Sequence, residues 1–241
     1  MNSPIITKKD ILSTVILANP KVLSVLERMD VKLGVGKQSI EDIATIHQIN
    51  PDAFALIINI YNNKNYYLQL DEKFEYLPDI LQYLKKSHAY FIEVKIPSIH
   101  RNIQQLVLQH TDPKAAMVEL FFRKYSNDVT HHMNYENNTV FPYIEMLLAA
   151  SLQKDSPFLP KEFRIDIYKD DHSNIEDALL DLKHILIQHL PQEEGALRFS
   201  TLQQLFELES DLHSHSRIEN EVIIPLAKGL EIQLNQTQKN R

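Results

Sequence analysis

Histidine and glutamate side chains recur in this sequence at a spacing that suits metal coordination. His132 and Glu136 lie four residues apart, and the same pair returns 83 residues later as His215 and Glu219. Neighbouring positions recur at the same offset: Asp128, Asn137 and Pro142 correspond to Asp211, Asn220 and Pro225. Because five residue types match across two segments, the repeat is far more specific than a single motif.

One further histidine precedes each pair on the preceding helical segment. These two residues, His88 and His172, are 84 positions apart. Residues four apart on an α-helix differ by only ~40° in direction, so the histidine and glutamate of each pair share a face. Apolar residues follow the same helical spacing around all six positions. The sequence therefore predicts four imidazoles and two carboxylates inside a helical core.

The chemistry expected of such a set is metal binding. A buried carboxylate is costly unless it is paired or binds a metal. Imidazole together with carboxylate suits iron, manganese or zinc, but not calcium or magnesium. Six ligands exceed what one ion in a bundle usually receives, so two ions that share two bridging carboxylates fit better, with two histidines on each. The candidate metal ligands are His88, His132, Glu136, His172, His215 and Glu219.

A lone histidine on an apolar face is more often a core residue than a ligand, but six matched positions favour coordination. His131 and His213 point away from the ligand face. The remaining histidines lack a paired carboxylate in the repeat and are read as surface or capping residues: His47, His100, His110, His184 and His189. Asp128 and Asp211 either orient ligands or are solvated charges, and the sequence leaves both open.

The elements that position the ligands are long helices. Only 4 of the 241 residues are glycine, which argues against a sheet protein with many tight turns. Four helical segments are expected at about 78–110, 114–150, 161–190 and 197–234, joined by short connections. Long helices with short loops predict an antiparallel bundle. The expected fold is all-α, with a four-helix bundle over 71–241 after a small helical domain and linker over 1–70.

Composition excludes several classes of function. The net charge of −7 disfavours nucleic acid and anionic lipid as partners. With no cysteine, the chain has no disulfide, no thiolate nucleophile and no cysteine-ligated metal. No apolar stretch approaches the ~18 residues of a membrane span, and residues 1–20 lack the layout of a signal peptide. A cytoplasmic protein is expected.

These residues resemble the hemerythrin-like (HHE) cation-binding family over about 77–230. The strings HHMNYENNTVFP and HSRIENEVIIP look like the two H-x3-E segments of that family. The resemblance implies a four-helix bundle around a non-haem di-iron centre. It places His88 and His132 on one iron and His172 and His215 on the other, with Glu136 and Glu219 as bridges. Four histidines and two glutamates are similar to the set in di-iron proteins that repair iron–sulfur clusters after oxidative or nitrosative stress.

The amino-terminal part looks like the small helical domain that precedes the bundle in such repair proteins. Asp30 and Gly36 flank the place where that domain carries a paired-cysteine turn. Here the intervening residues are Val-Lys-Leu-Gly-Val, so a thiolate mechanism at this turn is in doubt.

Three hypotheses for function follow. The first is a di-iron stress-response protein that repairs iron–sulfur centres or reacts with nitric oxide or oxygen, with an iron–sulfur protein as partner. The second is a module that binds oxygen or nitric oxide reversibly for sensing or storage, without turnover. The third is a metal-free bundle that mediates interactions. The sequence leaves open whether the protein is an enzyme.

Overall fold

The computed structural model describes residues 4–66, 74–109, 113–152, 165, 172–189 and 195–239. Throughout these residues the regular structure is helical, apart from one isolated antiparallel bridge between Ile11 and Ser39. The amino-terminal part contains four short helices: α1 (Leu12–Ala18), α2 (Val22–Arg28), α3 (Ile40–Ile46) and α4 (Pro51–Asn62). The expectation of an all-α protein is confirmed over the described residues.

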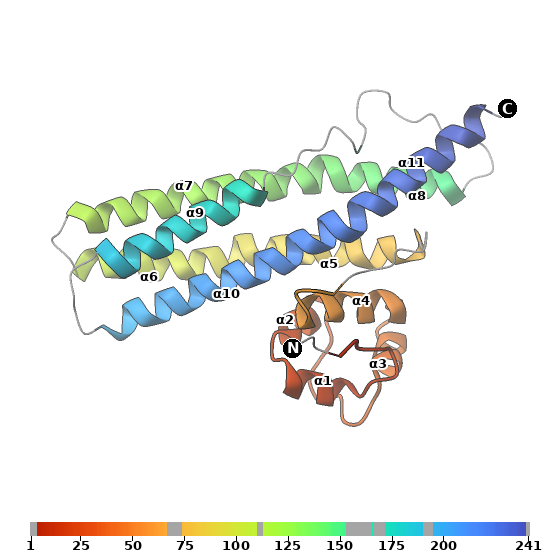
Figure 1. Cartoon of the computed structure of the whole chain (residues 1–241), viewed down its shortest axis with the longest axis horizontal. Helices are drawn as coiled ribbons and strands as arrows, with labels where there is room; N and C mark the ends of the chain where they lie inside the picture. The colour runs from red at the N-terminus through yellow and green to blue at the C-terminus, as the bar shows by residue number, and fades with distance from the viewer. Residues whose placement is uncertain are drawn as a thin grey trace. The chain divides into compact units, whose positions relative to one another are not determined.

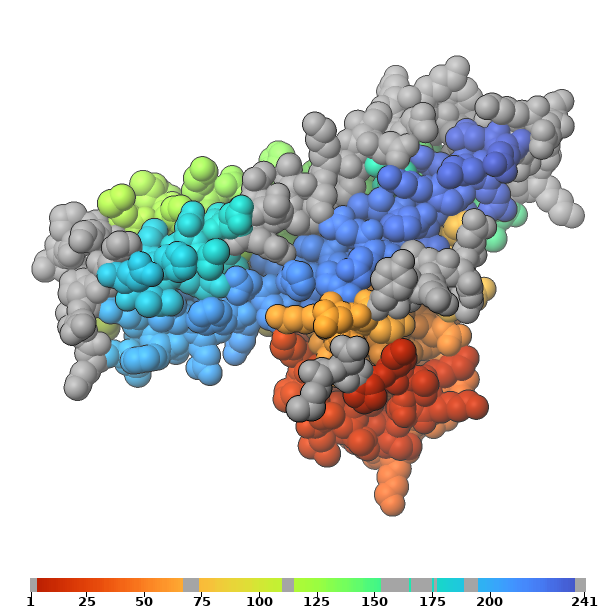
Figure 2. Space-filling model, viewed as in Figure 1, coloured from red at the N-terminus to blue at the C-terminus, as the bar shows by residue number. Residues whose placement is uncertain are grey.

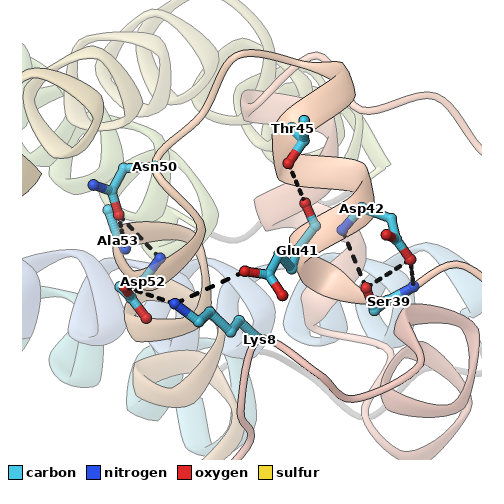
Figure 3. Close-up of polar contacts among 8 residues, drawn as sticks. All are labelled: Lys8, Ser39, Glu41, Asp42, Thr45, Asn50, Asp52 and Ala53. Carbon is cyan, nitrogen blue, oxygen red and sulfur yellow. Dashed lines mark hydrogen bonds and ion pairs between the residues drawn. The ribbon is translucent and has the colours of Figure 1, made fainter.

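Side-chain caps start two of the four short helices, α3 and α4. Ser39 accepts from the Asp42 backbone N–H at 3.1 Å, and the Asp42 carboxylate accepts from the Ser39 N–H at 2.9 Å, a reciprocal capping box for α3 (Figure 3). The pKa of Asp42 is lowered by the hydrogen bonds that its carboxylate accepts from the Ser39 hydroxyl, at 2.7 Å, and from the Ser39 N–H. Asn50 caps α4 by accepting from the Asp52 and Ala53 N–H groups. Helix α1 is an element that the sequence reasoning did not predict.

Buried polar side chains tie the amino-terminal helices together. The Asn59 side chain pairs with the backbone of Ile6 in both directions, at 2.8 and 2.7 Å. The Arg28 guanidinium is 3% exposed and donates to the Tyr61 hydroxyl at 3.0 Å. Figure 2 shows these helices, red to orange, as a closely packed group of side chains. The glycines that interrupt the loop before α3 adopt positive φ, 102° at Gly34 and 58° at Gly36, which explains why glycine stands there.

The rest of the described chain consists of long helices that continue through short π-helical turns (Figure 1). After the 3-10 turn η1 (Phe74–Tyr76), the segments are α5 (Leu77–Tyr90), η2 (Phe91–Lys95) and α6 (Ile96–Gln109), then α7 (Pro113–Tyr135), η3 (Glu136–Val140) and α8 (Phe141–Leu152). They are followed by α9 (His172–His184) with η5 (Ile185–His189), and by α10 (Ala196–Ile218), η6 (Glu219–Ile223) and α11 (Ile224–Lys239). The third predicted helix, 161–190, lies partly outside the described residues.

Each π turn has the same sequence relation to a proline. Pro97, Pro142 and Pro225 are each the second residue after a π turn, and Pro191 has the same spacing from η5 in the sequence. Proline lacks an N–H and its ring clashes with the carbonyl four residues earlier. A wider turn just before the proline accommodates both defects, so that the helix continues instead of ending.

The described residues fall into two compact units. One contains the described residues of 1–87, 141–167 and 214–241, and the other those of 88–140 and 168–213. In the first unit α8 packs on α11, while α2 and α3 pack on α4. The Glu231 carboxylate is 4% exposed there and accepts from the Tyr143 hydroxyl and from the Ile165 N–H at 2.9 Å.

The second unit has an apolar core drawn from four helical segments. Helix α7 packs on α6 and α9. Fully buried side chains from each segment meet in one cluster: Ile99 and Ile103, Phe122 and Val129, Leu182 and Leu186, and Leu205 and Leu208. Among the described helices, none combines the length and apolar character that a membrane crossing requires.

Candidate metal centre

In the first half of the repeat, three polar side chains and one amide meet in the buried interior. His88, near the end of α5, is 0% exposed, and Glu136, the first residue of η3, is 1% exposed. Their nearest atoms, His88 Nε2 and Glu136 Oε2, lie 3.4 Å apart. The second carboxylate oxygen, Glu136 Oε1, is 3.4 Å from His132 Nε2. One carboxylate therefore faces two imidazole nitrogens.

The other ring nitrogen of His88 indicates which atom can bind a cation. His88 Nδ1 lies 2.9 Å from the Asn137 amide oxygen. An amide oxygen only accepts hydrogen bonds, so this contact favours the tautomer with the proton on Nδ1 and the lone pair on Nε2. That lone pair then faces a carboxylate oxygen in a dry interior. A cation between the two acceptors, either a metal or a proton on Nε2, makes such an arrangement favourable.

The second half of the repeat presents the same pair of side chains. His215 Nε2 is 3.0 Å from Glu219 Oε1, and the two side chains are 3% and 2% exposed. Glu219 is the first residue of η6, as Glu136 is of η3. The repeat seen in the sequence is therefore also a repeat of local structure, down to the position of each glutamate in its π turn.

Four of the predicted residues lie close enough to share metal ions. His88, Glu136, His215 and Glu219 are all buried, and each offers one ligand atom that lies within 4.8 Å of the other three. Two atoms that bind one transition-metal ion at ~2.1 Å and at a right angle are roughly 3 Å apart. The pairwise separations of 3.0 to 3.4 Å agree with that geometry. Nitrogen and carboxylate donors of this kind suit iron, manganese or zinc.

The remaining two predicted ligands stand differently. His132 is 11% exposed and is not part of the group of four, although its Nε2 lies 3.4 Å from Glu136. His172 is the first residue of α9, and its side chain lies outside the described part of the structure. Five of the six predicted residues therefore contact another member of the set: His88 and His132 contact Glu136, and His215 contacts Glu219. The side chain of the sixth, His172, is not among the described residues.

The histidines read as surface residues have varied surroundings. His131 and His184 are exposed, whereas His47, His100 and His213 are partly buried. His100 packs against the Phe122 ring and places Nε2 3.6 Å from Glu119. His110 and the side chain of His189 lie outside the described residues. Of the two aspartates left open above, Asp128 is exposed and so belongs to the solvated face, while Asp211 is partly buried.

Sequence reasoning missed two contributors to this region. Asn137 belongs to the repeat, yet its hydrogen bond to His88 was not anticipated. The π turns were missed as well, although prolines six residues after Glu136 and Glu219 are the visible signal. In a regular α-helix the residue after a ligand points ~100° away from it. A π turn closes i→i+5 instead, so Glu136 and Asn137 serve the same site.

The fold and this cluster define the chain as an all-helical protein with a buried histidine–glutamate cluster suited to a metal. The chain is 20% identical over 223 residues to the iron-sulfur cluster repair protein ScdA of two strains of Staphylococcus epidermidis, which covers 90% of this chain and 97% of each relative. No protein-family profile matches the chain. The similarity is distant but extends over the amino-terminal helices as well as the long ones.

Proposed function

We propose that this chain is a non-haem di-iron protein of the oxidative and nitrosative stress response, with repair of iron–sulfur centres as its activity. The observation that carries the proposal is the donor set. Buried histidine nitrogens face buried carboxylate oxygens at 3.0 to 3.4 Å, and Asn137 fixes the His88 ring with its Nε2 lone pair toward Glu136. Metal-binding histidines typically donate their other ring N–H in this way.

The proposed centre is held by an antiparallel four-helix bundle of the hemerythrin-like kind. His88 and His132 would bind one iron and His172 and His215 the other, with Glu136 and Glu219 as bridges. Such a ligand set leaves coordination positions open, so the bound irons would supply sites for oxygen or nitric oxide. The protein's own contribution is to exclude water from the donors and to hold the His88 proton on Nδ1 through Asn137.

Support for the repair activity comes from the relatives, whose name is iron-sulfur cluster repair protein. An iron–sulfur protein is then the proposed partner. The absence of cysteine from the chain means that any such activity proceeds without a thiolate of its own. We further propose that 71–241 folds without 1–70, as the positions of all six ligands beyond residue 87 suggest.

A second candidate is reversible binding of oxygen or nitric oxide without turnover. The same open coordination positions support this candidate. It shares the ligand set of the first proposal and differs only in that the bound gas is released unchanged. A third is a metal-free bundle that mediates interactions. Its cost is that the Glu136 carboxylate, which faces His88, is removed from water with no metal beside it.

The test is iron content per chain together with the optical spectrum of the reduced protein before and after air. We expect about two irons per chain from an anaerobic preparation or after reconstitution with ferrous iron. Uptake of one ion or none by well-folded protein contradicts the di-iron centre and favours the metal-free bundle. A stable adduct with nitric oxide or oxygen that never turns over favours the binding module. His131→Ala is the matched control, because His131 is exposed and adjacent to His132.

A further inference from the structure

Arg217 stands between the two predicted ligands of the second half of the repeat, His215 and Glu219. It lies in the last turn of α10 and is 8% exposed. A buried guanidinium is costly unless all of its donors are satisfied. Its partners therefore show what this residue is for.

The guanidinium binds the carboxyl end of α4. It donates to the carbonyl oxygens of Ile60 at 3.4 Å, Asn63 at 3.1 Å and Tyr66 at 2.8 Å. The last carbonyls of a helix have no partner within the helix, and they form the negative end of its dipole. Arg217 thus acts as a cationic cap for α4 that is supplied from a residue more than 150 positions away in the chain.

The same guanidinium is oriented from the other side by a carboxylate. Its Nε and Nη2 atoms donate to the two carboxylate oxygens of Glu221, at 2.8 and 2.9 Å. Glu221 belongs to the π turn η6, whose first residue is Glu219. A two-point bond of this kind fixes the plane of the guanidinium. Arg217 therefore joins the end of α4 to the turn that presents His215 and Glu219.

The first half of the repeat has no counterpart of this link. The equivalent positions, 83 residues earlier, are Asn134 and Asn138, and both are exposed. The His-x3-Glu pattern does not require the arginine, since His132 and Glu136 form the same pattern with Asn134 in place of Arg217. The Arg217–Glu221 pair is an addition specific to the second half.

The amino-terminal helices also contact α5 shortly before His88. Arg28 Nη1 lies 3.4 Å from the Tyr83 hydroxyl, and the Asp30 carboxylate forms an ion pair with Lys86. Lys86 is two residues before His88. The Asp30–Lys86 pair is partly exposed and contributes little by itself. Arg217 is the stronger connection, because it forms three hydrogen bonds with the end of α4, whereas Arg28 reaches α5 through one contact of 3.4 Å.

We propose that Arg217 is a positioning residue through which the end of α4 and the metal-binding turn of α10 and η6 stabilise each other. The inference rests on the proposed function, since it takes His215 and Glu219 as iron ligands. If α4 stabilises the ligand-binding geometry of η6, then iron binding must also stabilise the end of α4, because coupling between two sites is reciprocal. The amino-terminal domain then has a role that needs no cysteine.

The test uses the full chain as wild type, Arg217→Gln, Arg217→Lys and the control Asn134→Ala. Iron affinity is measured by competition with a chelator, and amide hydrogen exchange is followed over 54–66 with and without ferrous iron. The Tyr66 N–H donates to Asn63 at 3.0 Å and reports on the capped end of α4. In the wild type and in Asn134→Ala, we expect iron to slow exchange there.

In Arg217→Gln we expect iron binding to weaken roughly 5- to 100-fold and the iron-dependent protection of 63–66 to disappear. Arg217→Lys keeps the positive charge but loses the planar guanidinium and its several donors. It should therefore retain only part of the iron affinity and part of the protection of 63–66. Wild-type affinity and wild-type protection in Arg217→Gln would overturn the proposal. If that variant does not fold, Arg217→Lys and Glu221→Gln decide in its place, and unchanged coupling in both counts against it.

The two proposals fail in different ways. A wild type that takes up no iron contradicts the di-iron function and the iron-dependent half of this inference. Amide hydrogen exchange in the iron-free protein still tests whether Arg217 stabilises the end of α4. Faster exchange over 63–66 in Arg217→Gln than in the wild type supports the cap, and equal exchange refutes it.

Discussion

The two halves of the repeat, 132–142 and 215–225, carry the same ligand types on the same π turn but are supported by different neighbours. In the first half, Asn137 of the π turn holds His88 of α5 by its ring Nδ1 at 2.9 Å. In the second half, Arg217 and Glu221 connect the turn to the end of α4. Asn220, the counterpart of Asn137, is exposed.

The comparison distinguishes the residues that both halves share from those that only one half has. Histidine, glutamate four residues later and proline six residues after that glutamate are common to both halves, and in both halves the glutamate is buried and is the first residue of a π turn. The Arg217–Glu221 pair is not shared, because Asn134 and Asn138 occupy the equivalent positions of the first half. In the first half the Asn137 amide orients His88, and in the second half Arg217 bonds to the end of α4.

The largest expected effect comes from removing what both halves share. In the double variant Glu136→Gln and Glu219→Gln we expect iron content to fall from about two per chain to near zero. Two ferrous ions bring four positive charges, and the two glutamates offset half of them. Each single variant should retain more iron than the double. Iron analysis and an anaerobic titration with nitric oxide measure this, and wild-type adducts in the double variant would show that the glutamates are not bridges.

The next effect tests whether the halves are equivalent. His132→Ala and His215→Ala should both lower iron occupancy while far-UV circular dichroism stays largely unchanged. The sequence repeat predicts equal losses. The geometry predicts a greater loss for His215, which is 3% exposed and in the group of four, than for His132, which is 11% exposed and outside it. A loss of iron in His131→Ala would mean that the assignment of the ligand face is wrong.

A smaller effect distinguishes the two asparagines. Asn137→Ala should weaken iron binding by about 10- to 100-fold, the usual cost of removing a hydrogen-bond partner from a ligating histidine. Asn138→Ala is the matched control and should change it little, since Asn138 is the neighbouring asparagine and is exposed. The same chelator competition measures both. Equal effects of the two substitutions would mean that the Asn137–His88 bond does not orient a ligand.

Much of the fold follows from the sequence, for local reasons. The caps at Ser39 and Asn50 are read directly from residue type and spacing, and the structure has both. The long helices follow from apolar periodicity and the scarcity of glycine. The burial of Glu136 and Glu219 follows from their places on an apolar face, and both are at most 2% exposed.

What the sequence did not disclose depends on contacts between distant segments. Arg217 appears in the sequence as an ordinary charged residue on a helix. Its carbonyl partners lie 151 to 157 residues away, and no local pattern identifies them. The π turns are an intermediate case. Each proline signals a helix defect, but a proline alone does not tell whether the helix ends, kinks or takes a wider turn.

The smallest expected effect concerns the prolines after the π turns, and it should differ between the two halves of the repeat. Pro142→Ala and Pro225→Ala both remove the reason for the π turn, because alanine restores the N–H and the ring no longer clashes. Where nothing else holds the turn, the helix can return to α geometry, which rotates the glutamate relative to the residues beyond it. In η6 the Arg217–Glu221 pair is a second constraint on the turn. The equivalent positions of the first half, Asn134 and Asn138, carry no charged pair.

We therefore expect Pro142→Ala to weaken iron binding by about 0.5–1 kcal/mol, and Pro225→Ala by less. Neither variant should lower the thermal stability of the iron-free protein, since proline inside a helix is itself unfavourable by about 3 kcal/mol. The combination Arg217→Gln with Pro225→Ala should lose more affinity than the two single losses added, because each support masks the loss of the other. Chelator competition on the four proteins completes the cycle. Additive losses would mean that the arginine holds α4 without holding the π turn, and the two halves would then differ only in what lies outside them.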